Sequence, residues 1–167
     1  MQTITKSFTV HAIGADVVAQ LRAKDDAGRT PGPFVDSEGG SPLRCCNRLS
    51  RPGERLVLAS YSPLHRWATT TGKDPGAYDE TGPVFLHAVP CDGPQDDAFP
   101  EDYRGLPRVL RAYDANGHIV GGRVIDEGDM QPERAIDGVF ADPQVAFIHA
   151  RALLAGCFTF AIERATG

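Results

Sequence analysis

The chain has 167 residues, of which 41% are hydrophobic and 23% are charged, and its formal net charge is -5. This length and composition fit one domain with a single core over residues 1–167. The acidic balance excludes a general nucleic-acid surface, which needs clustered Lys and Arg. No stretch approaches the roughly 20 apolar residues of a membrane helix, and the first residues have no signal-peptide pattern. We therefore expect a cytoplasmic protein that binds neither nucleic acid nor a membrane.

The first half of the chain alternates between short regular elements and long polar segments. Alternating apolar residues predict strands, apolar residues at helical spacing predict a helix that stops at Gly28, and clusters of Gly, Pro, Ser and Asp predict loops. The expected elements are a strand at 4–13, a helix at 15–28, a loop at 29–52, a strand at 54–61 and a long loop at 62–82.

The second half contains the clearest hairpin, whose two apolar runs meet at Asn116-Gly117, a pair that tolerates the positive φ of a tight turn. A short helix follows, with Pro132 in its first turn. The expected elements are a strand at 83–89, a polar loop at 91–107, the hairpin at 108–125, the helix at 131–143, and strands at 144–151 and 156–164. About seven strands and two short helices indicate an α+β fold with a largely antiparallel sheet.

The segment SPLRCCNR, from Ser41, places two of the four cysteines side by side after Arg44. Four cysteines in a chain of this size do not make the disulfide framework of a small secreted domain, so we expect reduced thiols. A guanidinium can lower the pKa of a neighbouring thiol, which favours Cys45 as a nucleophile. The alternative is that Cys45 and Cys46 are small buried hydrophobic residues.

Two histidines lie on strands that are otherwise apolar. His87 shares a strand face with Phe85 and Val89, and its ring nitrogens need partners there. In the terminal hairpin, pairing of odd with odd positions would bury Ile148 with the phenylalanines of the last strand. That register gathers four polar groups on the opposite face, namely His149, Arg151, Cys157 and Thr159. His87 and His149 are therefore candidate general bases for Cys45, or buried histidines bonded to the backbone.

The same residue types could bind a metal, but no pair has the Cys-x-x-Cys spacing that makes zinc a strong prediction. We assign no metal from the sequence. If one is bound, its ligands come from a set of thiols and imidazoles, namely Cys45 (or Cys46), His87, Cys91, His149 and Cys157.

Arginines beside these groups suggest an anionic ligand. Arg44 and Arg151 could grip a carboxylate or phosphate by two parallel hydrogen bonds, with Thr159 as a further ligand-binding residue. The alternative is an internal ion pair with an acidic residue of a nearby loop, such as Asp79 or Glu80. The dinucleotide, phosphate-loop and nucleophile-elbow motifs are not found.

Four segments carry a resemblance to a known family, namely SPLRCCNRLSRPGERLVLASYSP, YDETGPVFLHAVPC, RVLRAYDANGHIVGGRVI and DPQVAFIHARALLAGCFTFAIER. The chain resembles the bacterial domain-of-unknown-function family twelve-hundred-three from the first strand to the C-terminus. The resemblance implies a small single-domain protein and assigns no reaction or cofactor.

Two hypotheses follow from the sequence. The first is a pocket that binds a small anion through Arg44 and Arg151, with chemistry by Cys45 and a base at His87 or His149. The second is a non-enzymatic interaction module in which the cysteines and histidines are core residues or a structural metal site.

Overall fold

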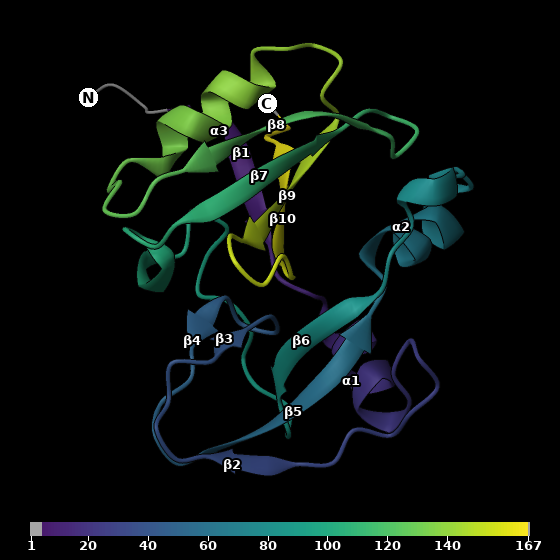
Figure 1. Cartoon of the computed structure of the whole chain (residues 1–167), viewed down its shortest axis with the longest axis vertical. Coiled ribbons are helices and arrows are strands. Elements are labelled where there is room, and N and C mark those ends of the chain that lie inside the picture. Colours follow the sequence, from purple (N-terminus) through teal and green to yellow (C-terminus); the bar gives the residue numbers. More distant parts are fainter. Residues whose placement is uncertain (1–4, 167) are drawn as a thin grey trace.

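The computed structural model describes residues 5–166 and confirms the α+β class, with mostly antiparallel strands. Its strands form two five-stranded sheets in place of the one sheet that we expected. Figure 1 shows the first sheet with α3 in the upper part of the molecule, and the second sheet with α1 in the lower part. None of the helices described is long and apolar enough to cross a membrane.

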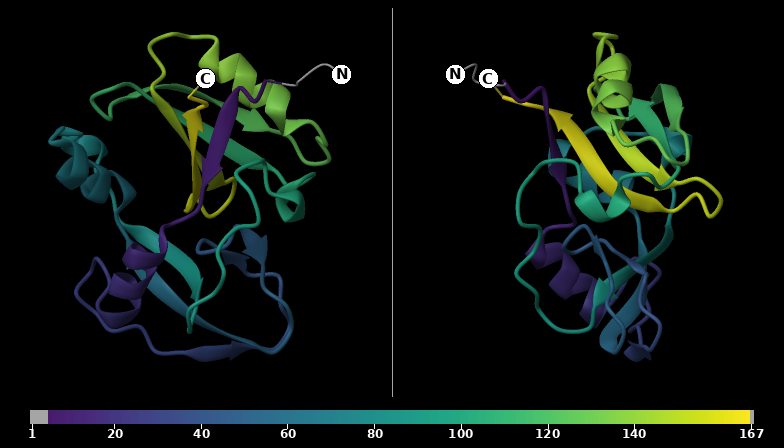
Figure 2. Two further views of the ribbon diagram at one scale, coloured as in Figure 1. Left: turned by 180° about the vertical axis from the view of Figure 1, so that it is seen from behind. Right: turned by 90° about the vertical axis from the view of Figure 1, so that its left-hand side faces the viewer.

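The first sheet has the order β1-β10-β9-β7-β8, and all its neighbouring strands are antiparallel. One of its faces is buried under α3, in a cluster that includes Leu110, Ile148 and Phe160. Figure 2 shows β1 and β10 running side by side along this sheet. The bounds are β1 Phe8–His11, β7 Arg108–Tyr113, β8 Ile119–Ile125, α3 Pro132–Phe140, β9 Phe147–Ala152 and β10 Phe158–Arg164.

The second sheet has the order β2-β5-β6-β3-β4, and its β3–β6 pair is parallel. Leu21 of α1 packs with Leu56 and Leu86 of β5 and β6 in a second core cluster. The bounds are α1 Ala15–Ala23, β2 Phe34–Asp36, β3 Pro42–Leu43, β4 Arg48–Leu49, β5 Glu54–Tyr61 and β6 Gly82–His87. The connecting segments contain α2 Pro63–Thr71 and the short helices η1 Gly76–Tyr78 and η2 Glu101–Tyr103.

The terminal hairpin follows the expected register only in part. Ala161 pairs with His149 and Ile162 with Ile148, so odd positions do meet odd positions there. An irregularity between Phe158 and Phe160 then shifts the pairing, so that Phe158 lies opposite Arg151. This bulge brings the Phe158 ring to 4.9 Å from the His149 ring.

Thr159 consequently leaves the face on which we expected it. Its hydroxyl oxygen accepts a hydrogen bond from Arg108, whose strand face carries Leu110 and is opposite to that of Arg111 and His149. The prediction that Thr159 and His149 share a face is therefore wrong. The physical reason is the extra residue at the bulge of β10. It reverses which face of the sheet the side chains point to in the part of β10 that precedes Phe160.

Candidate metal centre

The two adjacent cysteines lie in the turn that joins β3 to β4. Parallel pairing of β3 with β6 sets Leu43 opposite Phe85, and the Arg44 N–H donates to the Phe85 carbonyl. The chain continues in this register, so Cys45 reaches the level of His87, whose backbone N–H donates to the Cys45 Sγ over 3.4 Å. Asn47 then reverses the chain with a left-handed φ of 53°.

Three groups of this turn and of β6 are already at the separations of a tetrahedral site. The Cys45 and Cys46 Sγ atoms are 3.9 Å apart, and the His87 Nδ1 is 3.4 Å from the first and 3.8 Å from the second. Zinc bonds of about 2.3 Å to sulfur and about 2.0–2.1 Å to nitrogen give tetrahedral edges of about 3.8 Å and about 3.6 Å. Cys91 completes a set of four whose ligand atoms lie within 4.8 Å of one another.

An ionised carboxylate orients the imidazole of His87. The His87 Nε2 is 3.2 Å from Glu54 Oε1, and Glu54 accepts hydrogen bonds from the Arg48 guanidinium and the Arg51 backbone N–H. These bonds, that from Arg48 foremost, lower the pKa of Glu54 to about 2. A proton on Nε2 therefore has an acceptor, which leaves the Nδ1 lone pair free to point at the thiols.

A competing contact allows the other tautomer of His87. Arg48 Nη2 lies 3.2 Å from the His87 Nε2, so a Nε2 without a proton could accept from Arg48 instead. Because Arg48 Nη2 already donates to Glu54 Oε1 over 2.6 Å, the site does not depend on this contact. A metal at Nδ1 selects the tautomer in which Nε2–H donates to Glu54.

The two adjacent thiols differ in acidity. The Cys45 S–H donates to Cys46, which together with burial raises the pKa of Cys45 and is the main reason that the pKa of Cys46 is lowered. The expectation that Arg44 lowers the pKa of Cys45 is wrong, because the Arg44 guanidinium turns away to the carbonyls of Pro42 and Phe158. Cys46 is the thiol that ionises more readily.

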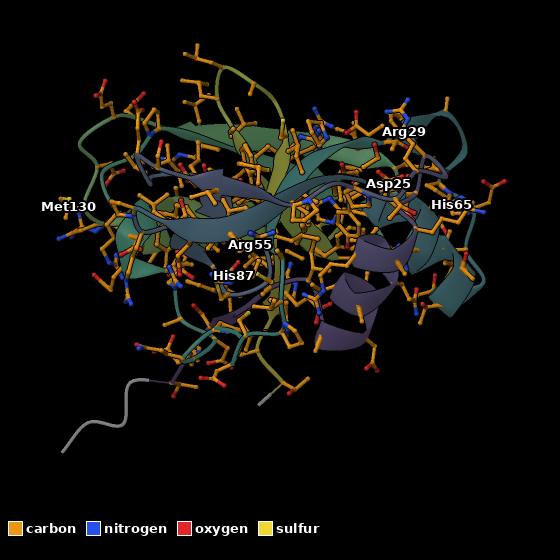
Figure 3. The ribbon with its side chains drawn as sticks, turned by 90° about the horizontal axis from the view of Figure 1, so that it is seen from below. Asp25, Arg29, Arg55, His65, His87 and Met130 are labelled. Atoms are coloured by element: carbon orange, nitrogen blue, oxygen red, sulfur yellow. The ribbon has the colours of Figure 1, made fainter. Side chains whose placement is uncertain are left out.

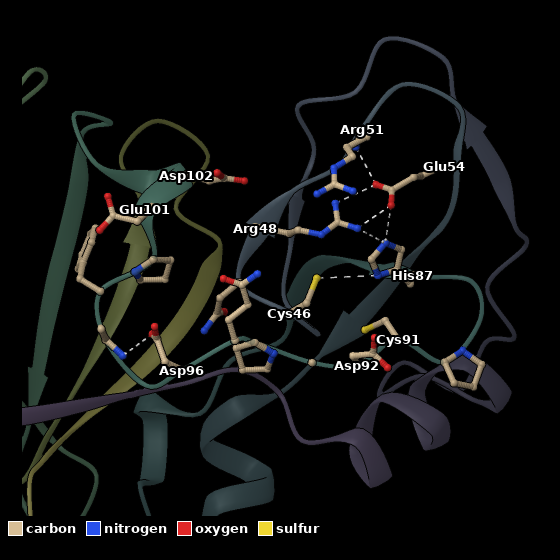
Figure 4. A pocket seen from close by; sticks show the side chains of 18 of the residues that line it. Cys46, Arg48, Arg51, Glu54, His87, Cys91, Asp92, Asp96, Glu101 and Asp102 are labelled. Atoms are coloured by element: carbon tan, nitrogen blue, oxygen red, sulfur yellow. Dashed lines mark hydrogen bonds and ion pairs between the residues drawn. The ribbon is translucent and has the colours of Figure 1, made fainter.

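Cavities lie on two sides of the four ligands. A cavity of about 680 Å³ is lined by Cys46, His87 and Cys91, and Figure 4 shows carboxylates across it from the thiols. A second cavity of about 690 Å³ is mainly apolar and is lined by Cys45, Cys91 and the start of α1. The carboxylates that line the first cavity are Glu54, Asp92, Asp96, Glu101 and Asp102.

Two of the five residues from which we expected metal ligands lie outside this group of four. His149 is buried among the rings of Tyr113, Phe147 and Phe158, at centroid distances of 4.8, 5.4 and 4.9 Å. Burial lowers its pKa to about 3, and its Nδ1 has no hydrogen-bond partner among the described residues. The half-buried Cys157 donates to the carbonyl of Ala155 over 3.6 Å. The structure thus brings together Cys45, His87 and Cys91, with Cys46 as the fourth.

The three expected anion-binding residues do not line either cavity at the cysteines. Arg151 forms an ion pair with Glu80 over 2.8 Å, which is the internal pairing that we gave as an alternative. Arg44 donates to the carbonyl of Phe158 over 2.8 Å, and Thr159 contacts Arg108. His65 lies with Asp25 and Arg29 at one end of the molecule, whereas His87 lies near its middle (Figure 3).

The sequence reasoning missed Glu54 and Arg48 as supports of the site. Arg48 begins the two-residue strand β4, which pairs with β3, and Glu54 begins β5, which pairs with β6. Nothing in their local pattern indicates that they meet at His87. The signal that does point to the site is the pair of thiols itself. Side by side in a turn, both can face the same imidazole.

The comparison with protein families matches residues 40–164 to the family described as "Protein of unknown function (DUF1203)". The chain belongs to this family. The match begins at residue 40, whereas we expected the resemblance to extend back to the first strand. Neither the curated proteins nor the solved structures that were searched give a significant match. Membership in DUF1203 brings no reaction, so the chemistry has to be argued from the site.

Proposed function

We propose that this DUF1203 protein is a zinc-binding protein, with Cys45, Cys46, His87 and Cys91 as its ligands. The observation that carries the proposal is the set of separations between the two thiols and the Nδ1 of His87, which match the edges of a zinc tetrahedron. Four protein ligands close the coordination sphere, which is the arrangement of a structural site. The ion would fasten the β3–β4 turn to the end of β6 and to the loop that follows.

Backbone groups around the thiols support this proposal. Thiolates are stabilised by hydrogen-bond donors. The backbone N–H of His87 donates to the Cys45 Sγ over 3.4 Å, and the backbone N–H groups of Arg48 and Gly93 act to lower the pKa of Cys46 and of Cys91. These bonds oppose the effect of burial, which raises the pKa of Cys45 and of Cys91.

The walls of the polar cavity favour a cation over an anion beside the thiols. Five carboxylates line the cavity against two guanidiniums, and Arg48 is already paired with Glu54. The excess negative charge raises the local concentration of a divalent cation. The four cysteines are all free, which suits a reducing compartment, and we include a cytoplasmic location in the proposal.

The test is metal analysis of untagged protein purified without chelator, before and after reconstitution with zinc. We expect one zinc ion per chain in the wild type and a loss of stoichiometric zinc in Cys46→Ala. Cys157→Ala is the matched control, because it also removes one thiol but lies outside the group. Cobalt substitution should give thiolate-to-cobalt charge-transfer bands that Cys157→Ala keeps. Wild-type protein that takes up no zinc, or Cys46→Ala that binds it equally well, would contradict the proposal.

A second candidate is thiol chemistry in the metal-free protein. The lowered pKa of Cys46, 3.8 Å from the His87 Nδ1 and at the wall of a cavity, favours Cys46 over Cys45 as a nucleophile. Alkylation of the metal-free protein near neutral pH should then modify one thiol first, identified by peptide mapping as Cys46. Four thiols that react at equal rates, with no metal bound, would leave the non-enzymatic module as the remaining hypothesis.

A further inference from the structure

Two guanidiniums lie in the interior without a carboxylate. Arg44 and Arg108 are 3% and 5% exposed, among the most buried polar residues of the chain. Neither has an acidic oxygen within 4.0 Å among residues 5–166. Buried charges in proteins are normally paired, because removal of an ion from water is costly unless an opposite charge replaces the lost hydration.

The other arginines of this fold show what is missing. Five arginines, all more exposed than this pair, form ion pairs with Asp or Glu at distances up to 2.8 Å. They are Arg48, Arg66, Arg104, Arg111 and Arg151. The two most buried arginines therefore lack the counter-charge that these five more exposed arginines have.

The partners of Arg44 and Arg108 are all neutral: Arg44 donates to the carbonyl of Pro42, and the other two partners are consecutive residues of β10. The Arg44 Nε–H donates to the Phe158 carbonyl over 2.8 Å, and the Arg108 Nη1 donates to the Thr159 Oγ1 over 3.0 Å. Because Phe158 and Thr159 are consecutive at the bulge of β10, the two guanidiniums lie close together. The ring of Tyr103 covers Arg108, with its centroid 4.4 Å from the Cζ atom.

Hydrogen-bond donors at this place are left over. The Arg108 Nε–H has no acceptor among the described residues. The fully buried Thr159 uses its oxygen to accept from Arg108, and no acceptor for its own hydroxyl proton is found in the same part of the chain. A buried donor without a partner costs about 1–3 kcal/mol. Unpaired hydrogen-bond donors beside two positive charges without a counter-charge are the groups that bind an oxyanion.

We propose that Arg44, Arg108 and Thr159 form a buried binding site for a small oxyanion, a phosphate, a sulfate or the carboxylate of a small molecule. The planar guanidinium presents paired donors that match the oxygens of such groups. Arg44 and Thr159 keep the anion-binding role expected from the sequence, and Arg108 takes the place of Arg151, which Glu80 neutralises.

The burial of both arginines and the repulsion of Arg44 by Arg108 agree with this site. Burial foremost lowers the pKa of both arginines, and repulsion by Arg108 adds to the effect on Arg44. Only Tyr103, together with Cys157 for Arg44, acts in the opposite direction, and no carboxylate contributes. The site is distinct from the proposed zinc site, because Arg44 and Cys45 extend to different neighbours from successive positions of the chain.

The experiment measures the melting temperature of the wild type in sodium phosphate, sulfate or citrate from 0.1 to about 30 mM, at ionic strength held constant with sodium chloride. Above the dissociation constant, each tenfold increase in one of these anions should raise the melting temperature by about 3–5 °C. Arg108→Met should lose this dependence. Arg134→Met, which removes an exposed arginine on α3, should keep it. Calorimetric titration of wild-type protein with the best of the three anions tests binding directly, so the result does not depend on a variant that folds.

A purely structural role of the arginines and an anion-binding role predict opposite signs for the difference in melting temperature between Arg108→Met and the wild type when the anion is present. If the arginines serve only as internal hydrogen-bond donors, Arg44 to backbone carbonyls and Arg108 to the Thr159 hydroxyl, an apolar residue in place of Arg108 relieves a buried charge. Arg108→Met then melts at the same or a higher temperature than the wild type in every buffer. If the site binds an anion, Arg108→Met melts at a higher temperature than the wild type without the anion. It melts at a lower temperature than the wild type when the anion is added. The proposal would be overturned if the melting temperature of the wild type did not rise with the concentration of any of the three anions and calorimetry gave no heat of binding.

Discussion

The buried imidazole of His149 should make the stability of the protein fall in weak acid. Its pKa is lowered from 6.5 to about 3, mainly by burial and further by the nearby Arg151 and Arg111. Between these two pH values the unfolded chain binds one more proton than the folded chain. Stability therefore rises with pH in this window, is complete above pH 6.5, and is lost as the pH falls.

The size of this effect follows from the shift. Each pH unit below 6.5 removes about 1.4 kcal/mol from the free energy of unfolding, so at pH 4.5 the loss is about 2.7 kcal/mol. His149→Phe isolates this contribution. Phenylalanine keeps an aromatic ring against Tyr113, Phe147 and Phe158 but cannot take up a proton.

Urea unfolding of both proteins, freed of metal by chelator, at pH 7.5, 6.5, 5.5 and 4.5 gives the four differences that are needed. The free energy of unfolding of the wild type should decline relative to that of His149→Phe by about 2.7 kcal/mol between pH 7.5 and pH 4.5. Acidic residues titrate alike in both proteins and cancel in the difference. Parallel curves would refute the reasoning, because they would mean that His149 is protonated equally in the folded and unfolded states.

Three further predictions concern the site and the packing. Glu54→Gln should weaken zinc affinity about 10–100-fold in a chelator competition, because it removes the ionised acceptor of His87; an unchanged affinity would show that Glu54 does not support the ligand. Gly117→Ala should destabilise the protein by more than Gly40→Ala in thermal unfolding, because both have a φ above +80° but only a Cβ at Gly117 meets Trp67, at 2.7 Å. Equal losses would assign the cost to the backbone alone. Leu86→Ala, at a fully buried position, should lower the free energy of unfolding by about 2–5 kcal/mol in urea, and a loss below about 1 kcal/mol would mean that the second core cluster is loosely packed.

Local patterns in the sequence were sufficient for the elements that depend on local chemistry. The Asn116-Gly117 turn between β7 and β8 is confirmed, with Gly117 at a φ of 82°. The prediction of a structureless loop at 62–82 is wrong, since it contains α2. Its breakers are the ends of that helix, because Pro63 occupies the first turn and Gly72 the left-handed position after the last.

The pairing of strands that are distant in the chain could not be predicted from the sequence. The three strands within residues 29–52 have two or three residues each, too short to show a period. No pattern in such short elements predicts that β3 lies parallel to β6. That pairing is what brings Cys45 to His87. The bulge in β10 was equally hidden, and it removed Thr159 from the group that we expected around His149.

The position of Arg44, Cys45 and Cys46 directly after the end of β3 determines where their side chains point. Strand alternation sends Arg44 toward β10 and Cys45 toward β6, and the turn that starts there lets Cys46 face the same imidazole as its neighbour. A cation and two thiols that are adjacent in sequence thus serve two proposed sites, one for an anion and one for a metal. Both sites depend on the conformation of one turn, so occupation of either should favour the conformation that the other needs. By thermodynamic linkage that coupling is reciprocal: zinc should tighten oxyanion binding by the same factor by which the oxyanion tightens zinc binding.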